Sequence, residues 1–226
     1  MRRTNSRAAA RCCTWLPDLR RVPGRDRIKK QAEGDPVKER GMIFNGEMVR
    51  AILDGGKTQT RRPVKVPHID RDAMCELSGN ELAGELSAGN YRNSPHGKPG
   101  DRIWVRETWA RYNIDQDSHD MAYRATPPAD WPEEGRWRPS IHMPRWASRL
   151  ILEITGVRVE RLQAITLGDI CKEIGCSLYD FRPATYGFQV WEELWKSIYG
   201  EENWQANPWV WVIEFKVVPN VQDNPA

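Results

Sequence analysis

Apolar and polar residues alternate along the chain in patterns that predict short strands and helices from Met42 onward. Met42–Phe44 is apolar and indicates a first strand. Asn45 can cap the helix that follows. The apolar positions of that helix recur at helical spacing, at Met48, Val49, Ile52 and Leu53. A pair of glycines ends the helix, and Lys57–Arg62 then reads as a short β segment that Pro63 stops.

Five further elements are expected in the second half of the chain. They are two strands, two helices and a closing strand, over 102–109, 150–159, 166–175, 188–199 and 209–218. Gly156 indicates a bulge in the second of these strands. The closing strand is apolar on both faces in its first half, which predicts burial on both sides. This order of elements favours an α+β fold, a small curved mixed sheet closed by helices, over a doubly wound parallel sheet.

The length of 226 residues suits one domain with a real core. We expect that domain over 42–218, followed by a C-terminal tail at 219–226. Two stretches within it, 63–100 and 112–140, are rich in turn-forming and polar residues and are expected to be loop-like insertions. The sequence does not indicate an oligomeric state.

The formal charge of +3 is unevenly distributed. Residues 1–41 hold twelve Lys and Arg against five Asp and Glu, whereas residues 42–226 hold 22 against 26. The overall charge is therefore no argument that the domain binds nucleic acid. The composition of residues 1–41 predicts disorder. Three explanations stay open for them: an unstructured extension, residues translated upstream of a native start at Met42, or an RNA-binding arm.

Several classes of protein are disfavoured by what the sequence lacks. No apolar run approaches the ~20 residues of a membrane-spanning helix, and none follows the N-terminal arginines as in a signal peptide. The five cysteines have no paired spacing, and the four histidines match no zinc motif. No phosphate-binding or dinucleotide-binding glycine motif is present. We therefore expect a cytoplasmic protein without a disulfide framework, metal site or cofactor.

Reactive side chains are densest in Gly55–Arg62, where a lysine, two hydroxyls and two guanidinium groups follow a glycine turn. In a strand Thr58, Thr60 and Arg62 share one face, whereas Lys57 starts at the turn and could swing to either side. These groups are typical of a pocket floor that binds an anion or a base and offers a hydroxyl nucleophile. A solvent-facing edge strand protected by its charges explains the pattern equally well.

Four stretches resemble a known family. Met42–Arg62 resembles the opening of ASCH domains, a PUA-like β-barrel family named for activating signal cointegrator homology. Gly100–Glu107 resembles the family's second strand, Ile165–Gly175 its helix and Trp209–Val218 its closing strand. The resemblance implies a PUA-like small mixed β-barrel with flanking helices, and a cleft that faces RNA or a nucleoside.

The resemblance also implies a chemistry. Some small ASCH proteins are amidohydrolases that remove the acetyl group of N4-acetylcytidine, with a lysine, a threonine and a helix glutamate as the catalytic set. The matching residues are Lys57, Thr60 and Glu173, in the roles of base, nucleophile and acid. We expect none of the three to be a core residue. The expected substrate-binding residues are Thr58, Arg61, Arg62 and Trp104.

Two alternatives to the enzyme stay open. A non-catalytic RNA-binding module needs the cationic and aromatic groups but not Glu173. The long, Trp-rich form of this chain looks similar to proteins carried by phages and prophages, which implies a prophage origin. A phage assembly or accessory factor is therefore the second alternative.

Overall fold

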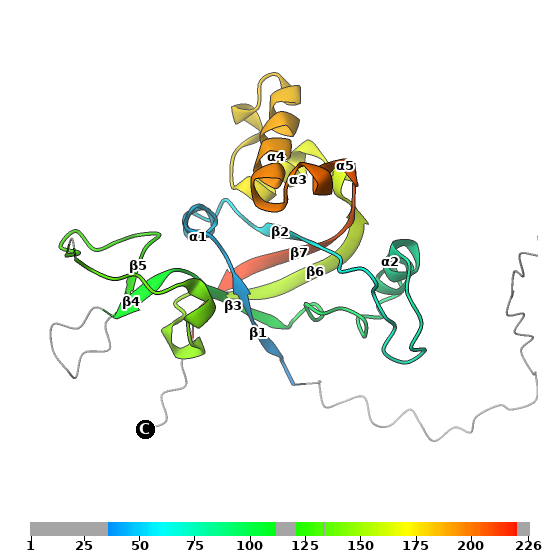
Figure 1. The fold of residues 1–226 in the computed structure, drawn as a ribbon, viewed down its shortest axis with the longest axis horizontal. Helices are drawn as coiled ribbons and strands as arrows, with labels where there is room; N and C mark the ends of the chain where they lie inside the picture. Colours follow the sequence, from blue (N-terminus) through cyan, green and yellow to red (C-terminus); the bar gives the residue numbers. More distant parts are fainter. Residues whose placement is uncertain (1–35, 112–120, 133, 221–226) are drawn as a thin grey trace, which may run out of the picture. The chain divides into compact units, whose positions relative to one another are not determined.

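The computed structural model describes residues 36–111, 121–132 and 134–220. The strands in these residues are β1 Glu39–Ile43, β2 Gln59–Pro63, β3 Arg102–Arg106, β4 Trp109–Arg111, β5 Met121–Tyr123, β6 Ile151–Arg161 and β7 Trp209–Val218 (Figure 1). The α-helices in the same residues are α1 Gly46–Leu53, α2 Gly79–Ser87, α3 Leu167–Ile174, α4 Ala184–Tyr199 and α5 Glu201–Gln205.

Five strands form one mixed sheet in the order β1-β3-β6-β7-β2. β1 runs parallel to β3, and the other neighbours are antiparallel. The fold class is therefore α+β, as the sequence predicts. β1 and β2 are the outer strands, and no backbone pairing joins them within the described residues, so these hydrogen bonds do not close the sheet into the expected barrel. One side-chain bond spans the gap, since the Arg62 guanidinium donates to Ile43 O at 2.7 Å.

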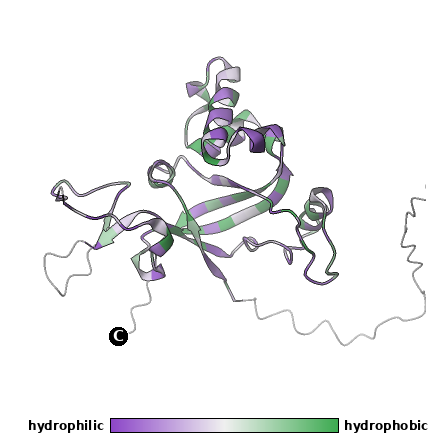
Figure 2. Ribbon diagram, in the orientation of Figure 1, coloured by the Kyte–Doolittle hydropathy of each residue, from purple (hydrophilic) through white to green (hydrophobic). Residues whose placement is uncertain are grey.

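Strand β7 separates two apolar cores because both its faces are buried, as its sequence predicts. Trp211 and Ile213 pack in the larger of the two, the main core, which includes residues of α1, α2, β3 and β6. Val210 and Val212 pack on the other side, with Trp195 of α4. Figure 2 shows hydrophobic residues interleaved with hydrophilic ones along β6 and β7. In Figure 1, α3, α4 and α5 gather at one end of these two strands, away from α2.

Local signals in the sequence account for several element boundaries. The Asn45 side chain accepts from Met48 N–H at 2.8 Å and caps α1. Thr166 caps α3 in the same way, and Gly175 ends that helix in the left-handed conformation, with φ of 89°. The predicted bulge in β6 appears as a shift of register between Ile154 and Gly156.

The first strand begins earlier than expected. β1 starts at Glu39, so residues 39–41, which we assigned to the N-terminal extension, belong to the sheet. A residue far along the chain holds this segment in place. Buried Asp101 accepts a hydrogen bond from Lys38 N–H at 3.0 Å and forms an ion pair with Arg40 at 3.3 Å. Residues 1–35 lie outside the described residues. The predicted disorder of the N-terminal extension therefore stays a prediction for them.

The two expected insertions contain regular structure. Within 63–100, Ser78 and Glu81 form a capping box that starts α2, and α2 buries Leu82 and Leu86 in the main core. The helical spacing of these two leucines was hard to recognise in the sequence, because glycines and an asparagine lie among them. The described part of 112–140 contributes β5, which pairs with β4 in a hairpin. Residues 112–120 and 221–226 lie outside the described residues.

Candidate functional site

The cationic motif forms the outer strand β2 and its approach, and its side chains alternate between two environments. Arg61 pairs with Val212 of β7 and faces α3, whereas Arg62 pairs with Trp211 and faces the main core. The turn before β2 lies directly against the end of α3, because a Cβ on Gly56 would come within 2.5 Å of Gly175 O. The two glycines therefore let the start of the motif touch the helix that carries Glu173.

Lys57 and Glu173 lie in direct contact in the protein interior. The Lys57 ammonium donates to the main-chain oxygen of Glu173 and lies 3.5 Å from its Oε1. Both side chains are buried, with exposed fractions of 0% and 4%. Burial lowers the pKa of Lys57 from its ordinary value, the nearby Glu173 carboxylate opposes this effect, and the Arg62 cation adds to it.

The Glu173 carboxylate also covers the free edge of β2. Its Oε1 accepts from the backbone N–H of Arg61 at 2.8 Å. The fully buried Arg61 guanidinium lies 2.5 Å from Glu160 and 3.6 Å from Asp169 and Glu173. Arg61, expected to bind substrate, is therefore an interior cation that ties β2 to β6 and α3. A buried charge is tolerated only when it is paired in this way.

The hydroxyl residues of the motif do not join the Lys57–Glu173 pair. Thr60 Oγ1 is buried and makes no hydrogen bond. Thr60 pairs with Ile213 and faces the main core. Side chains alternate along an extended segment, so a residue three positions from Lys57 points to the opposite side. Thr58 is exposed, and its backbone N–H donates to Lys172 O at 3.0 Å. The structure thus brings two of the three expected catalytic residues together, and all three are buried, contrary to our expectation that none belongs to the core.

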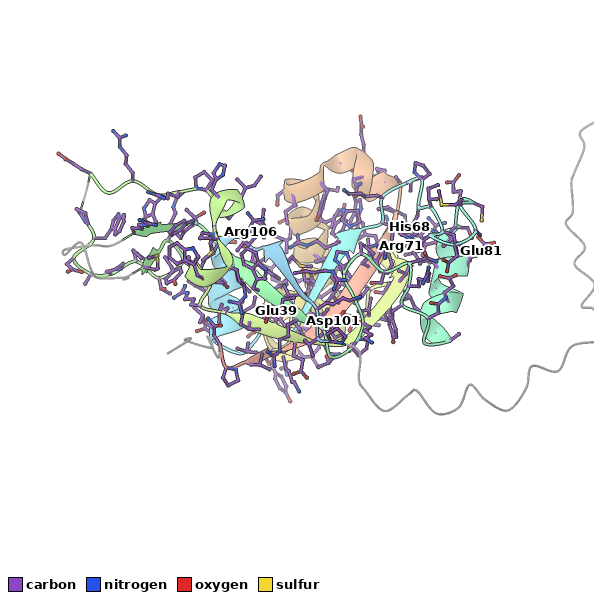
Figure 3. All side chains as sticks on the ribbon, turned by 90° about the horizontal axis from the view of Figure 1, so that it is seen from below. Glu39, His68, Arg71, Glu81, Asp101 and Arg106 are labelled. Atoms are coloured by element: carbon purple, nitrogen blue, oxygen red, sulfur yellow. The ribbon has the colours of Figure 1, made fainter. Side chains whose placement is uncertain are left out.

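A separate pocket of about 650 Å³ lies between the two outer strands. Its lining residues come from β1, β2, β3, β7 and two loops: Arg40, Gly41, Met42, Ile43, Arg62, Pro63, Lys65, His68, Pro95, His96, Ile103, Arg106 and Trp211. In the view of Figure 3, β1 and β2 lie between the labels of Arg106 and His68. Neither Lys57, Thr60 nor Glu173 lines this pocket.

The lining of the pocket is cationic. It includes four Lys or Arg residues, and no carboxylate from the described residues. Lys65 is exposed, and Arg62 reaches across to β1 as described. Arg106 donates to Ile141 O, and its guanidinium lies 5.3 Å from the centre of the Trp104 ring. These side chains make the pocket suited to an anionic ligand.

Two histidines flank Trp211 at the pocket. The rings of His68 and His96 meet the Trp211 ring edge-on, with centres 5.8 Å and 5.6 Å away. Burial lowers the pKa of His96 to about 4, and the cations Arg62 and Arg40 add to this effect. His96 therefore stays uncharged at neutral pH and can both donate and accept a hydrogen bond.

Of the four expected substrate-binding residues, only Arg62 lines this pocket, and His68, His96 and Trp211 were not predicted as site residues. The histidines lie in loops with no spacing that relates them, and only tertiary structure brings them to Trp211. Trp211 could have been found if the pairing of β2 with β7 had been anticipated, because it is the direct partner of Arg62. Trp104, expected to bind substrate, is absent from the lining, and its ring packs against Gly41 and the Arg106 guanidinium instead.

The chain matches no protein-family model, no curated protein sequence and no solved structure. Among the described helices, none has the length and apolar character needed to cross a bilayer. In the same part of the chain, no group of three or more His, Cys, Asp or Glu residues is arranged to hold a metal ion.

Proposed function

We propose that this protein binds RNA, or a nucleoside or nucleotide from it, in the pocket between β1 and β2. The proposal is carried by the lining, in which four cationic side chains surround apolar residues without a carboxylate from the described residues. Lys and Arg side chains bind phosphates, and apolar surface accepts a planar base. The volume of about 650 Å³ is in the range of small-ligand sites.

We infer in the same way that the sheet is PUA-like, as the ASCH resemblance implies. The support is the position of the outer strands, which face each other across the pocket and are bridged by Arg62 and Ile43. A barrel with one open seam has this arrangement. The seam is where a ligand would enter.

Hydrolysis of an N4-acylated cytidine is a second candidate. It is favoured by the contact between Lys57 and Glu173 and by the lowered pKa of Lys57, which is what a general base needs. Thr60 weighs against it, because its hydroxyl bonds neither residue. A nucleophile needs its base within hydrogen-bonding reach. We therefore place binding first.

Salt dependence tests the binding proposal. Fluorescence anisotropy with a short, labelled single-stranded RNA should show that affinity weakens as salt increases. Lys65→Ala removes one exposed cation of the pocket and should reduce the salt slope by about 0.7. Lys216→Ala is the matched control, because Lys216 is exposed and lies outside the lining. Binding that ignores salt, or no binding at all, would favour the assembly or accessory factor.

A direct assay tests the second candidate. The purified protein is incubated with N4-acetylcytidine, and release of cytidine is followed by chromatography. Turnover that Thr60→Ala abolishes without unfolding the protein would make hydrolysis the primary function. Folded protein without turnover would remove this candidate and leave the binding proposal intact.

A further inference from the structure

Strand β1 exposes a backbone edge toward the proposed binding pocket. Arg102 N–H donates to Lys38 O at 2.8 Å, and Phe44 N–H donates to Arg106 O at 3.0 Å. The even-numbered residues of β1 therefore bond to β3, and the odd-numbered ones direct N–H and C=O to the free edge. These odd-numbered residues are Glu39, Gly41 and Ile43.

Gly41 is the position where this edge is open to a ligand. Ile43 O is occupied, because it accepts from Arg62, and Glu39 does not line the pocket. Gly41 lines the pocket and has no side chain to cover its own backbone. A Cβ at this position would lie 2.6 Å from the Trp104 ring, so packing behind the strand explains why glycine stands here.

We propose that Gly41 reads the ligand by backbone hydrogen bonds, its N–H and C=O together engaging one edge of a base that carries a donor next to an acceptor. This inference rests on the proposed function and names the part of the ligand that the pocket recognises. The N–H and C=O of one extended residue point to the same side, as they do in an antiparallel pair. The amide edge of uracil and the amidine edge of cytosine present the complementary pattern.

The surroundings of Gly41 favour a base over an added peptide strand. Strand addition needs successive free positions along the edge, and the next odd position is already bonded to Arg62. The lining also includes the cations Arg40, Arg62 and Lys65, which can donate hydrogen bonds to the phosphate of a nucleotide. His96, another lining residue, offers an uncharged ring. The pocket therefore suits a single anionic nucleotide unit.

Two substitutions isolate the Gly41 N–H. Gly41→Pro removes this donor and leaves the ladder to β3 unchanged, because the group points to the free edge. Gly41→Ala is the matched control, since it brings the same Cβ against Trp104 but keeps the N–H. The probes are uridine 5′-monophosphate, its N3-methyl derivative, which lacks the ring donor, and ribose 5-phosphate, which lacks the base. Binding is measured by calorimetry, and folding by circular dichroism.

The wild type should bind uridine 5′-monophosphate about tenfold more tightly than the N3-methyl derivative, the difference expected for one hydrogen bond. Gly41→Pro should lose about tenfold in affinity for the nucleotide relative to Gly41→Ala, with unchanged affinity for ribose 5-phosphate. Equal wild-type affinity for all three probes would overturn the inference and leave phosphate binding standing. If the wild type binds none of the three probes, the proposed function is overturned too. If neither variant folds, the wild-type comparison of the methylated and unmethylated nucleotides decides.

Discussion

Protonation of His96 should destabilise the folded protein in mildly acidic solution. His96 is largely buried against Trp211, and burial together with the cations Arg62 and Arg40 lowers its pKa from 6.5 to about 4. The unfolded chain therefore takes up the proton at a higher pH than the folded protein. The contribution of His96 to stability is present above pH 6.5 and is lost as the pH falls toward 4. The pKa difference corresponds to about 3 kcal/mol of unfolding free energy.

Urea unfolding between neutral pH and pH 4 measures this effect. His96→Gln removes the titrating group, so its unfolding free energy should fall by about 3 kcal/mol less than that of the wild type over this range. His142→Gln is the matched control, because His142 is exposed, and its profile should parallel the wild type. Carboxylates titrate alike in all three proteins. A His96→Gln profile that parallels the wild type would refute the reasoning.

Three further predictions concern stability and are tested by urea or thermal unfolding. Glu173→Ala should lower the unfolding free energy by about 3–5 kcal/mol, because it leaves buried Lys57 without its carboxylate and removes one of the three carboxylates around Arg61, and Glu173→Gln should lower it less; an unaffected Ala variant would contradict the structural role of this carboxylate. Trp211→Ala should lower it by about 3–5 kcal/mol through the cavity it creates, and unchanged stability would mean that the β7 assignment is wrong. Deletion of residues 1–41 should leave a protein about 1–3 kcal/mol less stable than deletion of residues 1–36, since buried Asp101 loses its bonds to Lys38 and Arg40, and equal stability would show that β1 contributes little.

The elements with a strong local signal could be predicted from the sequence. The closing strand was predicted with the bounds that β7 has, and the cap at Asn45 was predicted correctly. The start of β1 was missed because its residues are polar and charged, and the buried carboxylate that bonds this segment lies 61 and 63 residues after Arg40 and Lys38. Helix α2 was missed because only Leu82 and Leu86 in it are buried, too few for a visible period.

The candidate site was predicted less completely than the fold. The resemblance grouped Lys57, Thr60 and Glu173, but the sequence could not show that Lys57 and Glu173 are buried or that Thr60 faces the other side of β2. The burial of these side chains, and the side of β2 from which each points, depend on the strand that pairs with β2. That strand, β7, lies far away in the sequence. The pocket was not visible for the same reason, since its lining comes from five distant parts of the chain.

The close approach of Gly56 and Gly175 has a consequence for how mutations will be tolerated. Neither residue carries a functional group, and they are far apart in the sequence, yet a side chain on Gly56 would meet the backbone at Gly175. In a library of single substitutions, both positions should therefore be as intolerant as Lys57 or Glu173. A search pattern for distant relatives gains selectivity if it requires this glycine pair along with the charged motif.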